Sequence, residues 1–345
     1  MTLVELMVAL VLGLIVTGAA MSVFLANKQT YLASENIGRL EESARVAFEV
    51  MARDIRETAV SNCGADLASA ANVLNNPGNA WYTDFGGGVR GYTGAATTAG
   101  KAFGSGEAQR VAGTGALELK SAEPAGATVK SHNPAAAQIL LNSAAHDFAA
   151  GDLAIICDAQ HAAIFQVTNA QGGASPSLVH NTGTASPGNC TKGLGSPVNC
   201  GAPVGTSYKF GCAYGGTDAS VDCSLAVNRW SAFVARLRAL RWYIGCNGRA
   251  ACTEPAGRSL YRSRLDTTGG VPAVKDDEIA EGVTDMDLAF LVQGGSDYVA
   301  AGSVSDWSQV VAVEVDLELT SRDLVDGNHV QRHLRHVVAL RSRAP

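Results

Sequence analysis

The apolar start of the chain is the segment that most constrains its fold. Glu5 is followed by a stretch from Leu6 to Asn27 that carries no charge. Roughly 20 apolar residues form about 30 Å of helix, which is enough to cross the hydrocarbon core of a bilayer. We therefore expect residues 1–27 to form one helix that spans a membrane or sits in the core of a helical bundle.

Glu5 is the unusual residue of this segment. A carboxylate at the edge of an apolar span costs several kcal/mol unless a cation neutralises it. The free amine of Met1 in a neighbouring copy is such a cation. Glu5 and Met1 are therefore predicted to act in assembly. The simpler alternative is an ordinary signal anchor in which Glu5 has no role.

Residues 28–58 extend the same helix. They contain no proline and only one glycine, Gly38, so nothing in them ends a helix. Apolar residues recur at steps of three and four, which predicts a single buried stripe made of Ile37, Leu40, Ala44, Ala47, Phe48, Met51 and Ile55. We expect a helix of about 85 Å whose second half lies against the rest of its own chain.

The remaining residues, 59–345, predict a globular head rich in strands. Two regions with many glycines and little periodicity, about 64–112 and 170–222, are expected to be long loops or insertions. Between and after them, runs with alternating or β-branched residues are predicted as strands: Ala116–Lys120, Ala127–Lys130, Gln138–Leu141, Leu153–Cys157, Ala163–Thr168, Ala235–Gly245, Ser259–Arg264, Met286–Val292, Val310–Thr320 and His333–Arg341. One helix followed by many strands indicates an α+β fold with a mostly antiparallel sheet.

Eight cysteines lie in the head and none lies in the apolar helix. Their even number favours disulfides in an exported protein. The close spacings suggest three short loops, and the fourth pair would tie the end of the helix to the sheet: Cys190–Cys200, Cys212–Cys223, Cys246–Cys252 and Cys63–Cys157. Eight cysteines allow about 105 connectivities, so the sequence leaves the pairing open.

The sequence offers weak candidates for catalysis, metal binding or cofactor binding. His329, His333 and His336 lie close together near the C-terminus, but positions 333 and 336 of a strand face opposite sides. The acidic run at residues 276–278 lacks the spacing of a calcium loop, and we expect a solvated loop there. Neither a nucleophile elbow nor a phosphate-binding loop is present. The prediction is a protein without enzymatic activity, metal or cofactor.

Nucleic-acid binding is also not expected. The formal net charge is −6, and the basic residues form no long patch outside the C-terminal tail. A DNA-binding surface requires clustered positive charge, because phosphate contacts supply most of the affinity.

The residues from Thr2 to Val16, TLVELMVALVLGLIV, resemble the N-terminal signature of type IV pilins and of the related pseudopilins of type II secretion. The resemblance implies cleavage by a prepilin peptidase, N-methylation of Met1, and pairing of Glu5 with the amine of a neighbouring subunit. It also implies a pilin-like head. The numbering is accordingly read as that of the processed protein. Met1 departs from the phenylalanine usual at this position.

Further segments resemble the PilW group of minor pilins, which is similar to the J-type minor pseudopilins. They are Arg39–Ala47 with Arg53–Arg56, Ala154–Val167, Leu237–Ile244, Ser259–Arg262, Ile279–Met286 and Val338–Arg341. The resemblance implies a structural minor pilin that primes pilus assembly and forms part of the tip. Its partners would be the V, X and FimU types of minor pilin, a PilY-type tip adhesin and the inner-membrane assembly platform.

Localisation follows from the same reasoning: a single pass through the inner membrane with the head in the periplasm, and then a cell-surface pilus. Two alternatives stay open. In the first, the chain is the major repeating subunit of a filament. In the second, it is a membrane-anchored periplasmic binding protein or enzyme. The functions that the resemblance implies for such a pilus are twitching motility, adhesion, DNA uptake or secretion.

Overall fold

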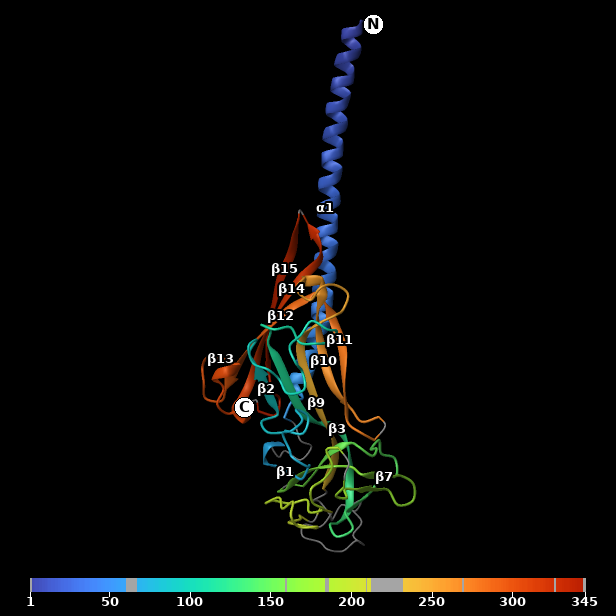
Figure 1. Cartoon of the computed structure of the whole chain (residues 1–345), viewed down its shortest axis with the longest axis vertical. Coiled ribbons are helices and arrows are strands. Elements are labelled where there is room, and N and C mark those ends of the chain that lie inside the picture. Colours follow the sequence, from blue (N-terminus) through green and yellow to red (C-terminus); the bar gives the residue numbers. More distant parts are fainter. Residues whose placement is uncertain are drawn as a thin grey trace.

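The computed structural model describes residues 2–59, 67–158, 160–183, 186–208, 210–211, 232–268, 270–325 and 327–343. A single long helix, α1 (Leu3–Arg56), stands out from a head built of strands (Figure 1). Its 54 residues correspond to about 81 Å at 1.5 Å per residue. The predicted continuous helix is therefore present and ends at Arg56.

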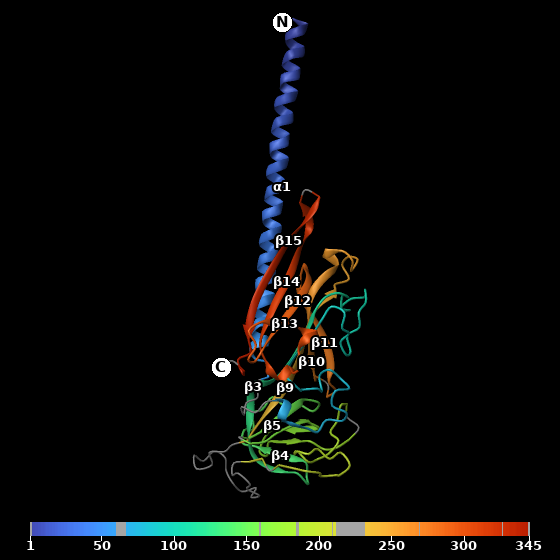
Figure 2. The same cartoon turned by 90° about the vertical axis from the view of Figure 1, so that its left-hand side faces the viewer.

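The two halves of α1 have different surroundings. Residues 2–32 are all exposed, and this half projects away from the head (Figure 2). The second half packs on the sheets, as the apolar stripe predicted. Its buried hydrophobic side chains are Leu40, Ala44, Ala47, Met51, Ala52 and Ile55. Alanines on this face let the helix backbone approach the strands closely.

The strands of the described residues form two sheets. The larger, 11-stranded sheet contains β1 (Ala71–Asn72), β2 (Val89–Tyr92), β3 (Ala116–Asn133), β4 (Gln138–Leu141), β5 (Leu153–Cys157), β6 (Ala162–Gln166), β7 (Asn169–Gln171), β8 (Ser177–Val179), β9 (Phe233–Cys246), β10 (Arg258–Asp266) and β11 (Ala273–Glu281). The smaller, four-stranded sheet has the order β13 (Tyr298–Ala300), β12 (Val283–Val292), β14 (Val310–Val325), β15 (Asn328–Ala339). In these parts of the chain only the β1–β6 pair is parallel, so the mostly antiparallel α+β prediction is confirmed at this level.

Three predictions about strands need correction. Ala116–Lys120 and Ala127–Lys130 belong to one strand, β3, whose register with β9 shifts between Ala122 and Gly126. A bulge absorbs the turn residues that suggested two strands. The acidic run at 276–278 lies in strand β11, where a loop was expected. The two expected insertions also contain short strands: β1 and β2 in the first, β7 and β8 in the second.

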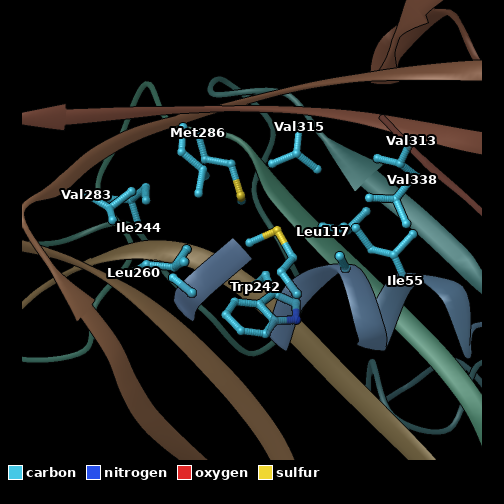
Figure 3. Packing of buried hydrophobic residues seen from close by; sticks show 14 of the residues in the cluster. Ile55, Leu117, Trp242, Ile244, Leu260, Val283, Met286, Val313, Val315 and Val338 are labelled. Atoms are coloured by element: carbon cyan, nitrogen blue, oxygen red, sulfur yellow. The ribbon is translucent and has the colours of Figure 1, made fainter. Parts of the chain in front are cut away.

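The main hydrophobic core lies between α1 and the two sheets. Trp242 and Met286 are completely buried, and they belong to one cluster with Ile55 of α1 and Leu117 of β3 (Figure 3). A second cluster fills the end of the head farthest from the N-terminus, around Phe165, β4 and β8. The head is thus joined to the helix by one core and extended by another.

Candidate assembly surface

Glu5 takes part in a capping box at the start of α1. The backbone N–H of Thr2 donates to Oε2 of Glu5 at 2.8 Å, and the N–H of Glu5 donates to Oγ1 of Thr2 at 3.4 Å. This reciprocal pair satisfies N–H groups that have no partner within the helix, and the carboxylate lies at the positive end of the helix dipole. This role was not predicted, although the sequence contains its known signature, Thr-x-x-Glu. Met1 lies outside the described residues.

The first half of α1 carries a continuous apolar surface. Every large hydrophobic side chain from Leu3 to Leu25 is at least half exposed, and Leu3 reaches 77%. An 18-residue apolar stretch of α1 has none of its residues buried in the head. By length and composition this helix is a candidate membrane anchor. A signal sequence has the same length and composition. An apolar surface of this size requires a cover of lipid or protein.

Asp54 forms a polar joint between the helix and the head. Trp242 Nε1 donates to Oδ2 of Asp54 at 3.1 Å, and a guanidinium nitrogen of each of Arg238 and Arg262 lies 3.6 Å from the carboxylate. Burial raises the pKa of Asp54, and the two arginines oppose that rise. Glu57 adds a contact to Arg238 at 3.1 Å. The helix end is thus fixed to β9 and β10, and no pattern in the sequence indicated this joint.

A groove runs between α1 and β15, where the β14–β15 hairpin lies beside the helix (Figure 2). Its volume is about 560 Å³. The floor is apolar, with Leu40, Ala44 and Phe48 from the helix and Leu334 from β15. The rings of Phe48 and His336 lie 4.2 Å apart by their centroids.

The charged groups buried in the head have structural partners. Arg241 donates from Nε and Nη2 to Oε1 of Glu118 at 3.0 and 2.6 Å, and Lys120 Nζ lies 3.4 Å from Oε2 of the same carboxylate. Burial lowers the pKa of Lys120. Arg241 also stacks on the ring of Trp81 at 4.4 Å. Because all three charged side chains are almost fully buried, no substrate reaches them from solvent.

The acidic residues of β11 are already paired. Lys101 Nζ lies 2.6 Å from Asp276, Arg264 Nε lies 2.8 Å from Asp277, and Arg249 pairs with Glu278. The histidines near the C-terminus do not converge on one point. His329 contacts a backbone carbonyl, His333 contacts Asp316, and His336 contacts Phe48. Within the described ranges, no group of three or more His, Cys, Asp or Glu side chains is arranged to hold a metal ion.

A histidine pair that the sequence analysis did not identify lies in the second core. His132 Nε2 and His180 Nε2 are 3.1 Å apart, and His132 Nδ1 lies 3.2 Å from the carbonyl of Tyr208. A carbonyl only accepts, so His132 carries its proton on Nδ1 and accepts from His180 Nε2–H. Burial lowers the pKa of His132 to about 4 and that of His180 well below its usual value.

Two disulfides close loops of the head. They join Cys190 to Cys200 and Cys246 to Cys252, which are two of the pairs suggested by the sequence. Cys157 is also disulfide-bonded. Its suggested partner, Cys63, and both members of the suggested pair Cys212–Cys223 lie outside the described residues.

Comparison with models of known protein families, with curated proteins and with solved structures finds no match.

Proposed function

We propose that this chain is a structural, non-enzymatic subunit of a type IV pilus, of the PilW class of minor pilins. One observation carries the proposal: the first half of α1 is an exposed apolar helix that starts at a capping carboxylate, and the second half of the same helix packs on a β-rich head. Such a helix is stable only in lipid or among other apolar helices. The resemblance of residues 2–16 to mature pilins supports packing among other apolar helices in the assembled state.

The proposed assembly proceeds from the inner membrane. The helix holds the subunit in the bilayer until a prepilin peptidase exposes the Met1 amine. Glu5 of one subunit then pairs with that amine of its neighbour, which offsets the cost of burying both charges. Within one chain the carboxylate of Glu5 accepts from the backbone of Thr2. It has further acceptor capacity for an amine, because a carboxylate has about four lone-pair sites.

The proposed partners are other pilins and minor pilins of the V, X and FimU types, a PilY-type tip adhesin and the inner-membrane platform. The main alternative is the major repeating subunit. A membrane-anchored binding protein or enzyme is the other alternative, and for it Glu5 would be dispensable.

Substitution of Glu5 tests the proposal. Glu5→Gln retains an oxygen that caps the helix but removes the charge, whereas Glu5→Ala removes both. We expect both variants to reach the membrane at normal levels and to be lost from sheared pili. Glu42→Gln is the matched control, since Glu42 is an exposed carboxylate of the same helix.

Normal incorporation of Glu5→Gln into pili would overturn the charge-pairing role. Immunogold labelling of sheared pili with an antibody against the head then separates the two pilin readings. Label at one end supports the minor, tip-complex role. Label along the shaft supports the major subunit.

A further inference from the structure

Each of the two sheets ends in a long strand that has only one neighbour. Among the described residues, β15 pairs only with β14 and β11 pairs only with β10. The strands contain 12 and 9 residues, and most residues of both are exposed or half-buried. The free side of such a strand presents unpaired N–H and C=O groups, which are a template for another strand.

The ladder between β14 and β15 fixes which backbone groups of β15 point outward. Leu340, just after β15, donates its N–H to the carbonyl of Val311 at 2.9 Å. In an antiparallel ladder the direction of the N–H group alternates from residue to residue. Positions 331, 333, 335 and 337 therefore direct their N–H groups away from β14. Val337 is 52% exposed, so no other described element buries this residue.

The two open strands carry opposite charges. β15 contains Arg332, Arg335 and three histidines but no carboxylate, whereas β11 contains four carboxylates and one lysine. Many of these charges have partners in their own copy, such as Arg335 with Asp316, so they contribute more to selectivity than to affinity. Two copies of β15, or two of β11, would repel each other. β15 against β11 is the favoured combination.

The placement of the strands suits a contact that repeats. Both run roughly along the axis of α1, and β15 lies nearer to the N-terminal end than β11 (Figures 1 and 2). A contact between different surfaces of identical copies is heterologous and produces a ring or an open helical array. Because β15 and β11 lie at different heights along α1, a contact between them would also offset each copy along the helix axis, as a growing filament requires.

We infer that β15 of one copy adds to β11 of a second copy as an extra strand, so that the small sheet of the first continues into the large sheet of the second. The backbone groups supply the hydrogen bonds, and the opposite charges set the choice of partner. The exposed side chains of Val337 and Val274, at 52% and 39%, give each edge an apolar contact as well. The contact does not involve Glu5.

Cross-linking of the full-length chain tests this contact. Arg332→Lys keeps the positive charge and places an amine on β15, while Lys275 supplies one on β11. Copies labelled with ¹⁴N and ¹⁵N are mixed in detergent micelles, allowed to associate and treated with a short amine-reactive cross-linker. We expect a 332–275 cross-link that joins peptides of different isotopic label. Its absence from associated material, or cross-links confined to a single label, would refute the strand pairing.

A backbone variant tests the hydrogen bonds directly. In the Arg332→Lys background, Val337→Pro removes one outward N–H but no bond to β14, and an edge strand tolerates proline there. We expect the yield of the mixed-label cross-link to fall about tenfold, because one donor is lost and the ring obstructs the incoming strand. Val337→Ala, which keeps the N–H, is the matched control and should stay within about twofold of the parent. An unchanged yield in folded Val337→Pro would overturn the inference.

A second variant covers the case in which Val337→Pro does not fold. Arg332 has no carboxylate partner among the described residues, so Arg332→Glu leaves the head's own ion pairs intact and places a carboxylate opposite acidic β11. Sedimentation should show association weakened about tenfold relative to Arg332→Lys. Equal association would contradict the pairing. A 332–275 cross-link together with normal pili from Glu5→Gln would uphold this inference alone, whereas loss of pili from Glu5→Gln without the cross-link would uphold only the role of Glu5.

Discussion

Trp242 of β9 donates its indole N–H to the carboxylate of Asp54 on α1 at 3.1 Å, although the two residues are 188 positions apart in the chain. Trp242 is completely buried, and Asp54 is 5% exposed. The bond therefore lies inside the interface between the helix and the head. With Arg238 and Arg262 it gives the amphipathic half of α1 a fixed position on the sheet.

Asp54→Ala should destabilise the head. The substitution leaves the indole N–H without an acceptor and two guanidinium groups without their shared carboxylate, and breaking such buried contacts costs about 2–4 kcal/mol. Asp54→Asn keeps an acceptor for Trp242 and should cost less. Urea denaturation of the full chain in detergent measures both. A loss below about 0.5 kcal/mol for Asp54→Ala would show that the joint contributes no more than a surface site.

The His132–His180 pair should make the head less stable in acid. Burial lowers the pKa of His132 from 6.5 to about 4, so the unfolded chain binds more protons than the folded chain between these pH values. The stability is fully present above pH 6.5 and falls as the pH decreases toward 4, with a slope of up to about 1.4 kcal/mol per pH unit for one histidine.

Denaturation of the wild type and of a His132→Gln/His180→Phe double variant at a series of pH values checks this slope. The variant lacks both imidazoles, so its stability should depend less on pH in this window. Equal slopes would assign the acid sensitivity to other groups. Lys192 is the nearby cation that acts on His180, and Lys192→Gln serves as a control for its effect.

The Cys190–Cys200 disulfide should stabilise the end of the head that holds the second core. It joins cysteines 10 positions apart, and closing a loop of that length contributes about 3 kcal/mol by restricting the unfolded chain. The Cys190→Ser/Cys200→Ser double variant should lose most of this stabilisation and become sensitive to proteolysis between the two positions. The Cys246→Ser/Cys252→Ser variant, with its shorter loop, should lose somewhat less.

Two glycine substitutions of opposite sign test the packing. A Cβ added at Gly91 of β2 would meet the ring of Phe290, whereas one added at Gly38 of α1 meets nothing within 4 Å. Gly91→Ala should cost about 1–3 kcal/mol through overpacking. Gly38→Ala should gain up to about 1 kcal/mol through helix propensity. Thermal unfolding distinguishes the two, and a neutral Gly91→Ala would indicate that the sheet can move away from Phe290.

Features that depend on local pattern were predictable from the sequence. The helix and its buried stripe follow from three- and four-residue spacing between Ile37 and Ile55, and strands such as β4 and β5 match their predicted bounds. Glu5 is conspicuous because its neighbours in the chain are uncharged. Each of these properties lies within a short window of residues.

Features that depend on distant partners were not predictable. The run at 276–278 has the composition of a loop, and only cations from elsewhere, such as Lys101, make a strand suitable there. Asp54 has the pattern of an exposed helix residue until Trp242 covers it. His132 and His180 are 48 residues apart and give no joint signal in the sequence.

The continuity of α1 determines how the molecule carries mechanical load. A force on the head is transmitted to the N-terminus through α1, a single uninterrupted helix of 54 residues. Because the long strands of the head run roughly along that helix (Figure 2), the contacts between them are loaded in shear and resist together rather than opening one after another. Tension passes from the helix to the head through the core along the second half of α1 and through the joint at Asp54.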